Sequence, residues 1–130
     1  MRLKVVTSPT AKGKEEEKKM STNEKHIPVV GEKLYLYTPC NNYWVSMVRN
    51  PFTVENINKN KTAVVIRAAR PVFYGPVYYD TLPDTIVDDP AGKTMTLRWS
   101  EKKHRWQESP AGSYPRVAVF GAWDYQPYLN

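Results

Sequence analysis

A cluster of basic and aromatic residues near position 100 carries the strongest chemical signal in the sequence. Two tryptophans enclose a short polar run that is rich in lysine and arginine. Such cations neutralise phosphates, and an exposed indole ring stacks on a nucleic-acid base for roughly 1–3 kcal/mol. We therefore predict a hairpin that contacts nucleic acid or another partner. Its candidate contact residues are Arg98, Lys102, Lys103, His104, Arg105 and Trp106.

The same residues also have an ordinary structural explanation. Residues 94–99 alternate between polar and apolar, with Met95, Leu97 and Trp99 on one face, as in a half-buried strand. This alternation predicts that Trp99 belongs to the core and that Trp106 is the more exposed ring. A lysine-rich tip is also what a soluble turn requires. The cluster alone therefore leaves binding and solubility as competing explanations.

A second candidate surface is aromatic. Phe73, Tyr74, Tyr78 and Tyr79 lie close together in the middle of the chain. Tyrosine combines a stiff apolar ring with a polar hydroxyl, and it is enriched at contact surfaces. Because alternation buries some of these rings, we expect one or two to be exposed. We select Tyr78 and Tyr79 as candidate partner-binding residues.

Metal and cofactor sites are not indicated. An acidic segment includes Asp80, Asp84, Asp88 and Asp89. Its spacing does not match the EF-hand pattern, and a solvated acidic loop is the commoner explanation. Cys40, His26 and His104 are too few and too scattered for a zinc site. We expect neither a metal ion nor a cofactor.

Enzyme motifs are also missing from the sequence. It contains no G-x-S-x-G, no H-E-x-x-H and no glycine-rich phosphate loop. The competing enzyme hypothesis is a toxin-type ribonuclease on a small barrel, with His104 as acid or base and Arg105 as a phosphate clamp. The motifs of that family are absent as well. We expect a non-enzymatic binding protein.

The formal charge of +6 is divided between two parts of the chain. Residues 1–19 contain six Lys/Arg and three Glu, and residues 20–130 contain thirteen Lys/Arg and ten Asp/Glu, so each part carries +3. The main body is thus only mildly basic. Net charge by itself is a weak argument for nucleic-acid binding.

The N-terminal segment, residues 1–26, is predicted to be a flexible, disordered charged arm, because it has too little apolar surface to order itself. Lysine and glutamate codons are purine-rich, and KEEEKK stands just before Met20. We hypothesise that residues 1–19 are a translated ribosome-binding region and that Met20 is the native start. The alternative is a genuine basic tail. The first reading implies a gene from a bacterium or a phage, and N-terminal sequencing of naturally expressed protein tests it.

Residues 27–130 are predicted to form one domain of short strands. Strand-like runs cover 33–37, 43–48, 52–57, 62–69, 94–99, 105–107 and 116–120. The polar turn 58–61 predicts a hairpin, and 72–79 forms either two short strands or an aromatic loop. Residues 80–89 read as a loop, and the aromatic tail 122–129 is expected to dock. Strands at this spacing favour a sandwich or small barrel.

Two further features bound the location of the protein. No apolar run is long enough for a membrane-spanning helix, which needs about 20 residues. The single cysteine, Cys40, cannot form an internal disulfide. This usage fits a reducing cytosol.

Three segments resemble the opening of an SH3-like or KOW-type small barrel: VGEKLYLY (30–37), RNPFTVENI (49–57) and KTAVVIR (61–67). The resemblance implies an all-β SH3-like or related barrel, here with an extra β-hairpin, and barrels of this kind bind RNA, DNA or protein. From Met20 on, the chain also resembles small proteins common in phages and prophages. We expect a phage- or mobile-element-encoded module in the bacterial cytoplasm that contacts nucleic acid. The alternative is a protein-binding module: an inhibitor of a host or defence factor, or a virion component.

Overall fold

The computed structural model describes residues 25–126. The predicted arm up to residue 24, including the proposed leader 1–19, and the last four residues lie outside these. Within the described part, the regular secondary structure is almost entirely β, with one closed barrel and a separate two-stranded hairpin. The predicted fold class, an all-β small barrel with an extra hairpin, is confirmed.

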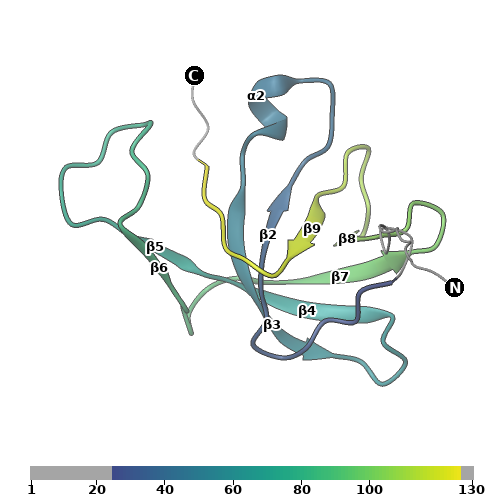
Figure 1. The fold of residues 1–130 in the computed structure, drawn as a ribbon. Coiled ribbons are helices and arrows are strands. Elements are labelled where there is room, and N and C mark those ends of the chain that lie inside the picture. The colour runs from purple at the N-terminus through teal and green to yellow at the C-terminus, as the bar shows by residue number, and fades with distance from the viewer. Residues whose placement is uncertain (1–24, 127–130) are drawn as a thin grey trace, which may run out of the picture.

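The barrel is an antiparallel meander interrupted once (Figure 1). Each barrel strand pairs with the next along the chain, and the last strand returns to pair with the first. Closure leaves the barrel strands without an open edge. In order around the barrel the strands are β2 (Lys33–Tyr37), β3 (Asn50–Ile57), β4 (Ala63–Ala68), β7 (Thr94–Ser100), β8 (Arg105–Ser109) and β9 (Val117–Phe120).

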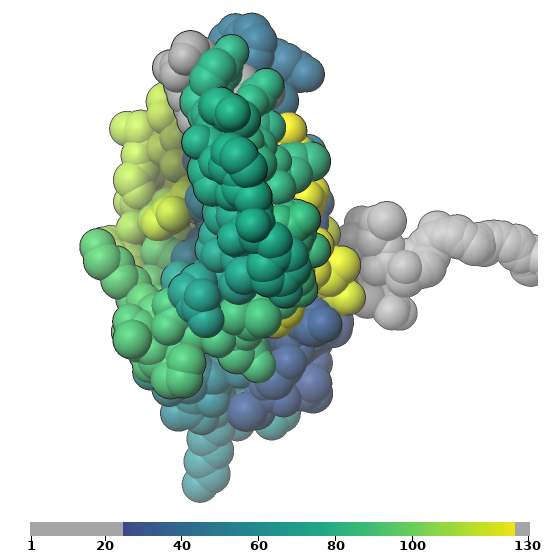
Figure 2. All heavy atoms as spheres, turned by 90° about the vertical axis from the view of Figure 1, so that its left-hand side faces the viewer, coloured from purple at the N-terminus to yellow at the C-terminus, as the bar shows by residue number. Residues whose placement is uncertain are grey.

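The interruption is a hairpin that leaves the barrel between β4 and β7. Its strands are β5 (Arg70–Val72) and β6 (Thr85–Val87), which pair only with each other. Figure 2 shows this hairpin as a teal-to-green column at the front of the molecule. Residues 73–84 are therefore an extended loop, one of the two predicted alternatives. The short strand β6 within the predicted loop 80–89 was not expected.

One predicted strand is wrong. Residues 43–48 were expected to be extended, but Tyr43–Ser46 form a single helical turn, α2. Asn42 caps the turn, because its side chain accepts a hydrogen bond from the amide of Val45 at 3.2 Å. Both neighbours of β2 in the barrel are already supplied by β3 and β9. An additional strand next to β2 would have no partner there.

The core lies inside the barrel and follows the alternation of its strands. The central inward-facing residues of β2, β4 and β7 are fully buried, as the period of two predicts, whereas Met95 and Trp99 on the same face of β7 are only partly buried. Their burial from water is the main favourable contribution to folding. The buried cluster consists of Leu34, Leu36, Phe52, Val54, Val64, Ile66, Leu97 and Trp106.

Two tryptophan hydrogen bonds hold the segments that precede the first barrel strand and follow the last one. The indole of Trp106 donates to the carbonyl of His26 at 2.8 Å, and the indole of Trp123 donates to the carbonyl of Phe52 at 2.8 Å. Lys25 and His26, assigned from the sequence to the flexible arm, therefore contact the barrel. The tail is docked as far as Gln126, whose backbone pairs with that of Arg49. Residues 127–129 of the predicted docked tail lie outside the described residues.

No helix within residues 25–126 has the length and apolar character needed to span a bilayer.

Candidate functional site

The predicted basic hairpin is the β7–β8 hairpin. Ser100 and Arg105 close it, so that residues 101–104 form its tip. The carbonyl of Ser100 accepts from the amide of His104 at 2.7 Å, and its hydroxyl accepts from the amide of Lys103 at 3.2 Å. His104 has a φ of 54°, in the left-handed region, which allows the tight return into β8. Lys102 and Lys103 are consequently exposed on a well-defined turn.

The predicted exposure of Trp106 is wrong. Its side chain is only 2% exposed and belongs to the buried core. Trp106 lies directly opposite Trp99 in the β7–β8 register, and directly opposed residues point to the same face of a sheet. Since Trp99 is on the inward face, Trp106 is as well. A prediction of the hairpin register would have revealed this, because a four-residue tip already pairs 99 with 106.

Trp99 is the more accessible of the two rings. It is partly buried and packs against the core. Its ring meets that of Trp106 edge to face at a centroid distance of 5.7 Å, and the ring of His104 lies 6.3 Å from it. The ammonium of Lys25 lies 5.7 Å from the centroid of Trp99, within cation–π range. The more accessible ring at this hairpin is therefore Trp99, although it packs against the core as the sequence predicted.

A second turn adds cations to the same end of the barrel. Strands β4 and β7 pair, and the amide of Trp99 donates to the carbonyl of Thr62 at 3.2 Å. The β3–β4 turn, which carries Lys59 and Lys61, thus lies beside the β7–β8 hairpin, and both turns are at the right of Figure 1. Lys25 joins them, because its ammonium donates to the carbonyl of Lys61 at 2.6 Å.

We call this region the basic end. The sequence identified its hairpin but missed the contribution of the neighbouring turn and of Lys25. Within residues 25–126 no member of this set forms an ion pair, whereas Arg49, Arg67 and Arg116 each pair with a carboxylate. Its positive charge is therefore available to an external anion. The basic end comprises Lys25, Lys59, Lys61, Arg98, Lys102, Lys103 and Arg105.

A groove of about 480 Å³ lies between the β7–β8 hairpin, the end of β9 and the segment before β2. We call it the aromatic groove. The carboxylate of Glu32 accepts from the amide of Val29 at 3.1 Å and lies 2.9 Å from Nε2 of His26. His26 in turn stacks at a tilt on Phe120, 4.9 Å between centroids. The groove is lined by His26, Glu32, Trp99, His104, Arg105, Trp106, Ala118, Phe120 and Gly121.

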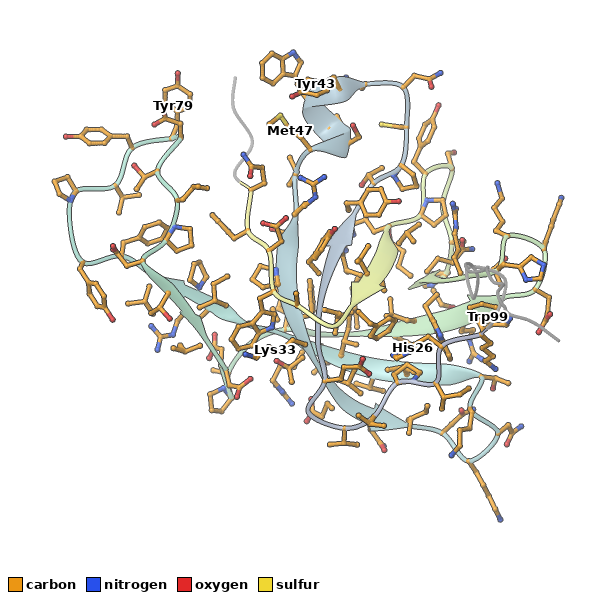
Figure 3. The ribbon with its side chains drawn as sticks, viewed as in Figure 1. His26, Lys33, Tyr43, Met47, Tyr79 and Trp99 are labelled. Atoms are coloured by element: carbon orange, nitrogen blue, oxygen red, sulfur yellow. The ribbon has the colours of Figure 1, made fainter. Side chains whose placement is uncertain are left out.

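Tyr78 and Tyr79 lie elsewhere. Both are on the loop of the β5–β6 hairpin and are strongly exposed, as is Tyr74. Figure 3 shows Tyr79 on the far side of the barrel from Trp99 and His26. Phe73 is partly buried and meets the ring of Tyr125. Three of the four rings are thus exposed, one more than expected, and they form a surface separate from the basic end.

Three of the four aspartates in the acidic segment accept hydrogen bonds within the fold. Asp84 accepts a hydrogen bond from the amide of Tyr74 at 2.7 Å, and Asp88 accepts from the hydroxyl of Thr53 at 2.9 Å. Asp89 accepts from the amide of Ala91 at 3.0 Å. Over residues 25–126, no group of three or more histidine, cysteine, aspartate or glutamate side chains is arranged to hold a metal ion.

Comparisons of the chain with models of protein families, with curated proteins and with solved structures found no match.

Proposed function

We propose that this protein is a non-enzymatic binding module that contacts nucleic acid through the basic end. The observation that carries the proposal is that two neighbouring turns bring four lysines to the same end of the barrel as the partly exposed Trp99, where Lys25 and the strand residues Arg98 and Arg105 add three further cations. None of these cations is neutralised by a carboxylate within residues 25–126. A polyanion is the ligand that such a surface attracts.

The chemistry favours recognition of the phosphate backbone over reading of base sequence. Lysine ammonium groups on exposed turns act as mobile point charges, and they form no fixed bidentate geometry. Arg105 has more order, because its Nε donates to Oε1 of Gln107 at 2.9 Å. Its other guanidinium donors make no hydrogen bond to residues 25–126, so they can meet a phosphate. The biological setting in this proposal is the one that the sequence resemblance implies, a phage or prophage gene acting in the bacterial cytoplasm.

A second candidate function is recognition of a host or phage protein, and a specific observation favours it. The β5–β6 loop exposes Tyr74, Val77, Tyr78, Tyr79 and Leu82, each more than half accessible. Exposed tyrosines anchor many protein interfaces. This surface contains no lysine or arginine between residues 73 and 84. Binding through it would therefore depend little on salt, unlike binding through the basic end.

Fluorescence anisotropy of labelled DNA and RNA at two salt concentrations tests the proposal. With about four phosphates contacted on a single strand, raising salt from about 50 to about 200 mM should weaken binding about 50-fold. The double variant Lys102→Glu, Lys103→Glu should weaken it at least about 10-fold. A matched control is Arg70→Glu, Lys93→Glu, which makes the same charge change at exposed positions away from the hairpin tip. Equal losses in the two variants would contradict a localised site.

A further inference from the structure

We propose that the nucleic acid bound at the basic end is single-stranded, and that its bases stack in the aromatic groove against Trp99. This inference rests on the proposed function, and it names the form of nucleic acid that the same site takes.

The first support is the composition of the groove. Aromatic or heteroaromatic rings come from three separate segments: His26 before β2, Trp99 and His104 on the β7–β8 hairpin, and Phe120 at the end of β9. His104 is exposed, and the side chain of His26 is 48% accessible. A site for phosphate alone needs cations and backbone amides, not rings. Rings that line a recess are what base stacking requires.

The second support is the division of roles between the two tryptophans. Trp106 is buried, and its indole nitrogen is occupied by the carbonyl of His26 at 2.8 Å. It forms the floor of the groove and fixes the segment that makes the opposite wall. Trp99 packs on this floor while keeping part of its ring accessible. The ring offered to a ligand is thus held in a fixed orientation before the ligand binds, which reduces the entropy lost on binding.

The third support is the position of the cations relative to the rings. The ammonium of Lys25 lies 5.7 Å from the centroid of Trp99 and 5.4 Å from that of Trp106. Arg105 lines the groove, and the exposed lysines Lys102 and Lys103 lie on the adjacent tip of the hairpin. A nucleotide whose base stacks on Trp99 would have cations beside its phosphates. Proteins that bind single strands combine rings that stack on bases with cations that contact the phosphates, and this site has both.

A duplex cannot use this arrangement. Each base in a duplex is covered on both faces by its neighbours, so a ring in a recess cannot stack on it without unpairing. A duplex would reach only the lysines on the turns. The single carboxylate among the groove-lining residues, Glu32, is 17% accessible, and both of its oxygens already have partners in Val29 and His26.

The test measures the affinity of the full 130-residue chain for one labelled strand of mixed sequence, about 15 nucleotides long. The strand is used once alone and once annealed to its complement. The single strand should bind at least about 10-fold tighter. Trp99→Ala should weaken single-strand binding about 10-fold while changing duplex binding less than about 2-fold. Trp44→Ala, at an exposed tryptophan on α2, is the control and should change neither affinity.

A second measurement keeps the test valid if Trp99→Ala does not fold. An unlabelled oligothymidylate should quench the tryptophan fluorescence of the wild-type protein, and Trp99→Phe should lose most of that quenching while still binding. Duplex binding that equals single-strand binding, or quenching that survives in Trp99→Phe, overturns this inference. If that duplex binding still depends on Lys102 and Lys103, the proposed function survives. Absence of binding to either form overturns both.

Discussion

The rings of Trp99 and Trp106 meet edge to face across β7 and β8, with centroids 5.7 Å apart and planes inclined at 63°, and only Trp106 is buried. The two residues are paired in the register and share one face of the sheet. Trp106 completes the core and holds the segment before β2, whereas Trp99 remains open to the aromatic groove. One cross-strand pair thus supplies both a structural ring and the ring proposed to contact the ligand.

This difference predicts unequal effects of the same substitution. Trp106→Phe removes buried atoms and leaves the carbonyl of His26 without its donor. It should lower the free energy of unfolding by about 2–4 kcal/mol. Trp99→Phe, at a partly exposed ring, should cost less than about 1.5 kcal/mol. Urea unfolding of both variants measures this, and a larger loss for Trp99→Phe would contradict the assigned roles.

Gly92 is predicted to resist substitution. Gly92 closes a turn, because its amide donates to the carbonyl of Asp89 at 2.9 Å. A Cβ added at this position would collide with the backbone carbonyl of Ala68. Backbone atoms on β4 cannot move aside as a flexible side chain would. Gly92→Ala should therefore destabilise the protein by about 1–3 kcal/mol.

The control for this prediction is Gly112→Ala, where a Cβ meets no atom within 4 Å. Its stability should stay within about 0.5 kcal/mol of wild type. Thermal unfolding distinguishes the two positions. Equal midpoints for Gly92→Ala and Gly112→Ala would show that the turn is looser than the contacts with β4 indicate.

How far the sequence predicts this structure is seen by comparing its strands with its turns. Strand β2 and the pair β3 and β4 follow from alternation and from the polar turn between them, because these signals act between neighbours in sequence. The run 43–48 has strand-like residues, yet it forms α2. Strand propensity reflects a side chain that packs on a sheet, and the closed barrel offers this segment no sheet position.

Only the β7–β8 hairpin of the basic end was predicted from the sequence. The lysines near position 102 are neighbours along the chain, whereas Lys59 and Lys61 join them only because β4 pairs with β7 across the inserted β5–β6 hairpin. Strand order depends on long-range contacts that no local pattern contains. The same is true of Lys25, which a composition argument assigns to the charged arm although its ammonium bonds to the carbonyl of Lys61.

The ion pair between Glu55 and Arg67 predicts a pH dependence of stability. The guanidinium donates two hydrogen bonds of 2.8 Å to the carboxylate. These hydrogen bonds, aided by the positive charge, outweigh partial desolvation and hold the pKa of Glu55 below its ordinary value of 4.5. A depressed carboxyl pKa stabilises the folded state above the unfolded-state value, and this stabilisation is lost as pH falls through the folded-state pKa.

Glu55→Gln should therefore be less stable than wild type at neutral pH, and the difference should shrink as the pH falls below 4.5. Urea unfolding at a series of pH values measures it. The pair is partly exposed to water, so the difference should be small. A difference that stays constant down to pH values at which Glu55 is protonated would show that the ion pair is not its source.

The ribonuclease hypothesis predicts that RNA is cleaved in the binding assay, whereas a non-enzymatic module leaves it intact. His26 and His104 line the same groove as Arg105, so the residue types for acid–base cleavage are present. However, Nε2 of His26 is occupied by the carboxylate of Glu32 at 2.9 Å, and His104 meets the ring of Trp99 edge-on. A non-enzymatic module should leave a labelled RNA intact over hours while binding it. Cleavage that disappears in His104→Gln, with binding retained, would identify the protein as a ribonuclease and make the aromatic groove its active site.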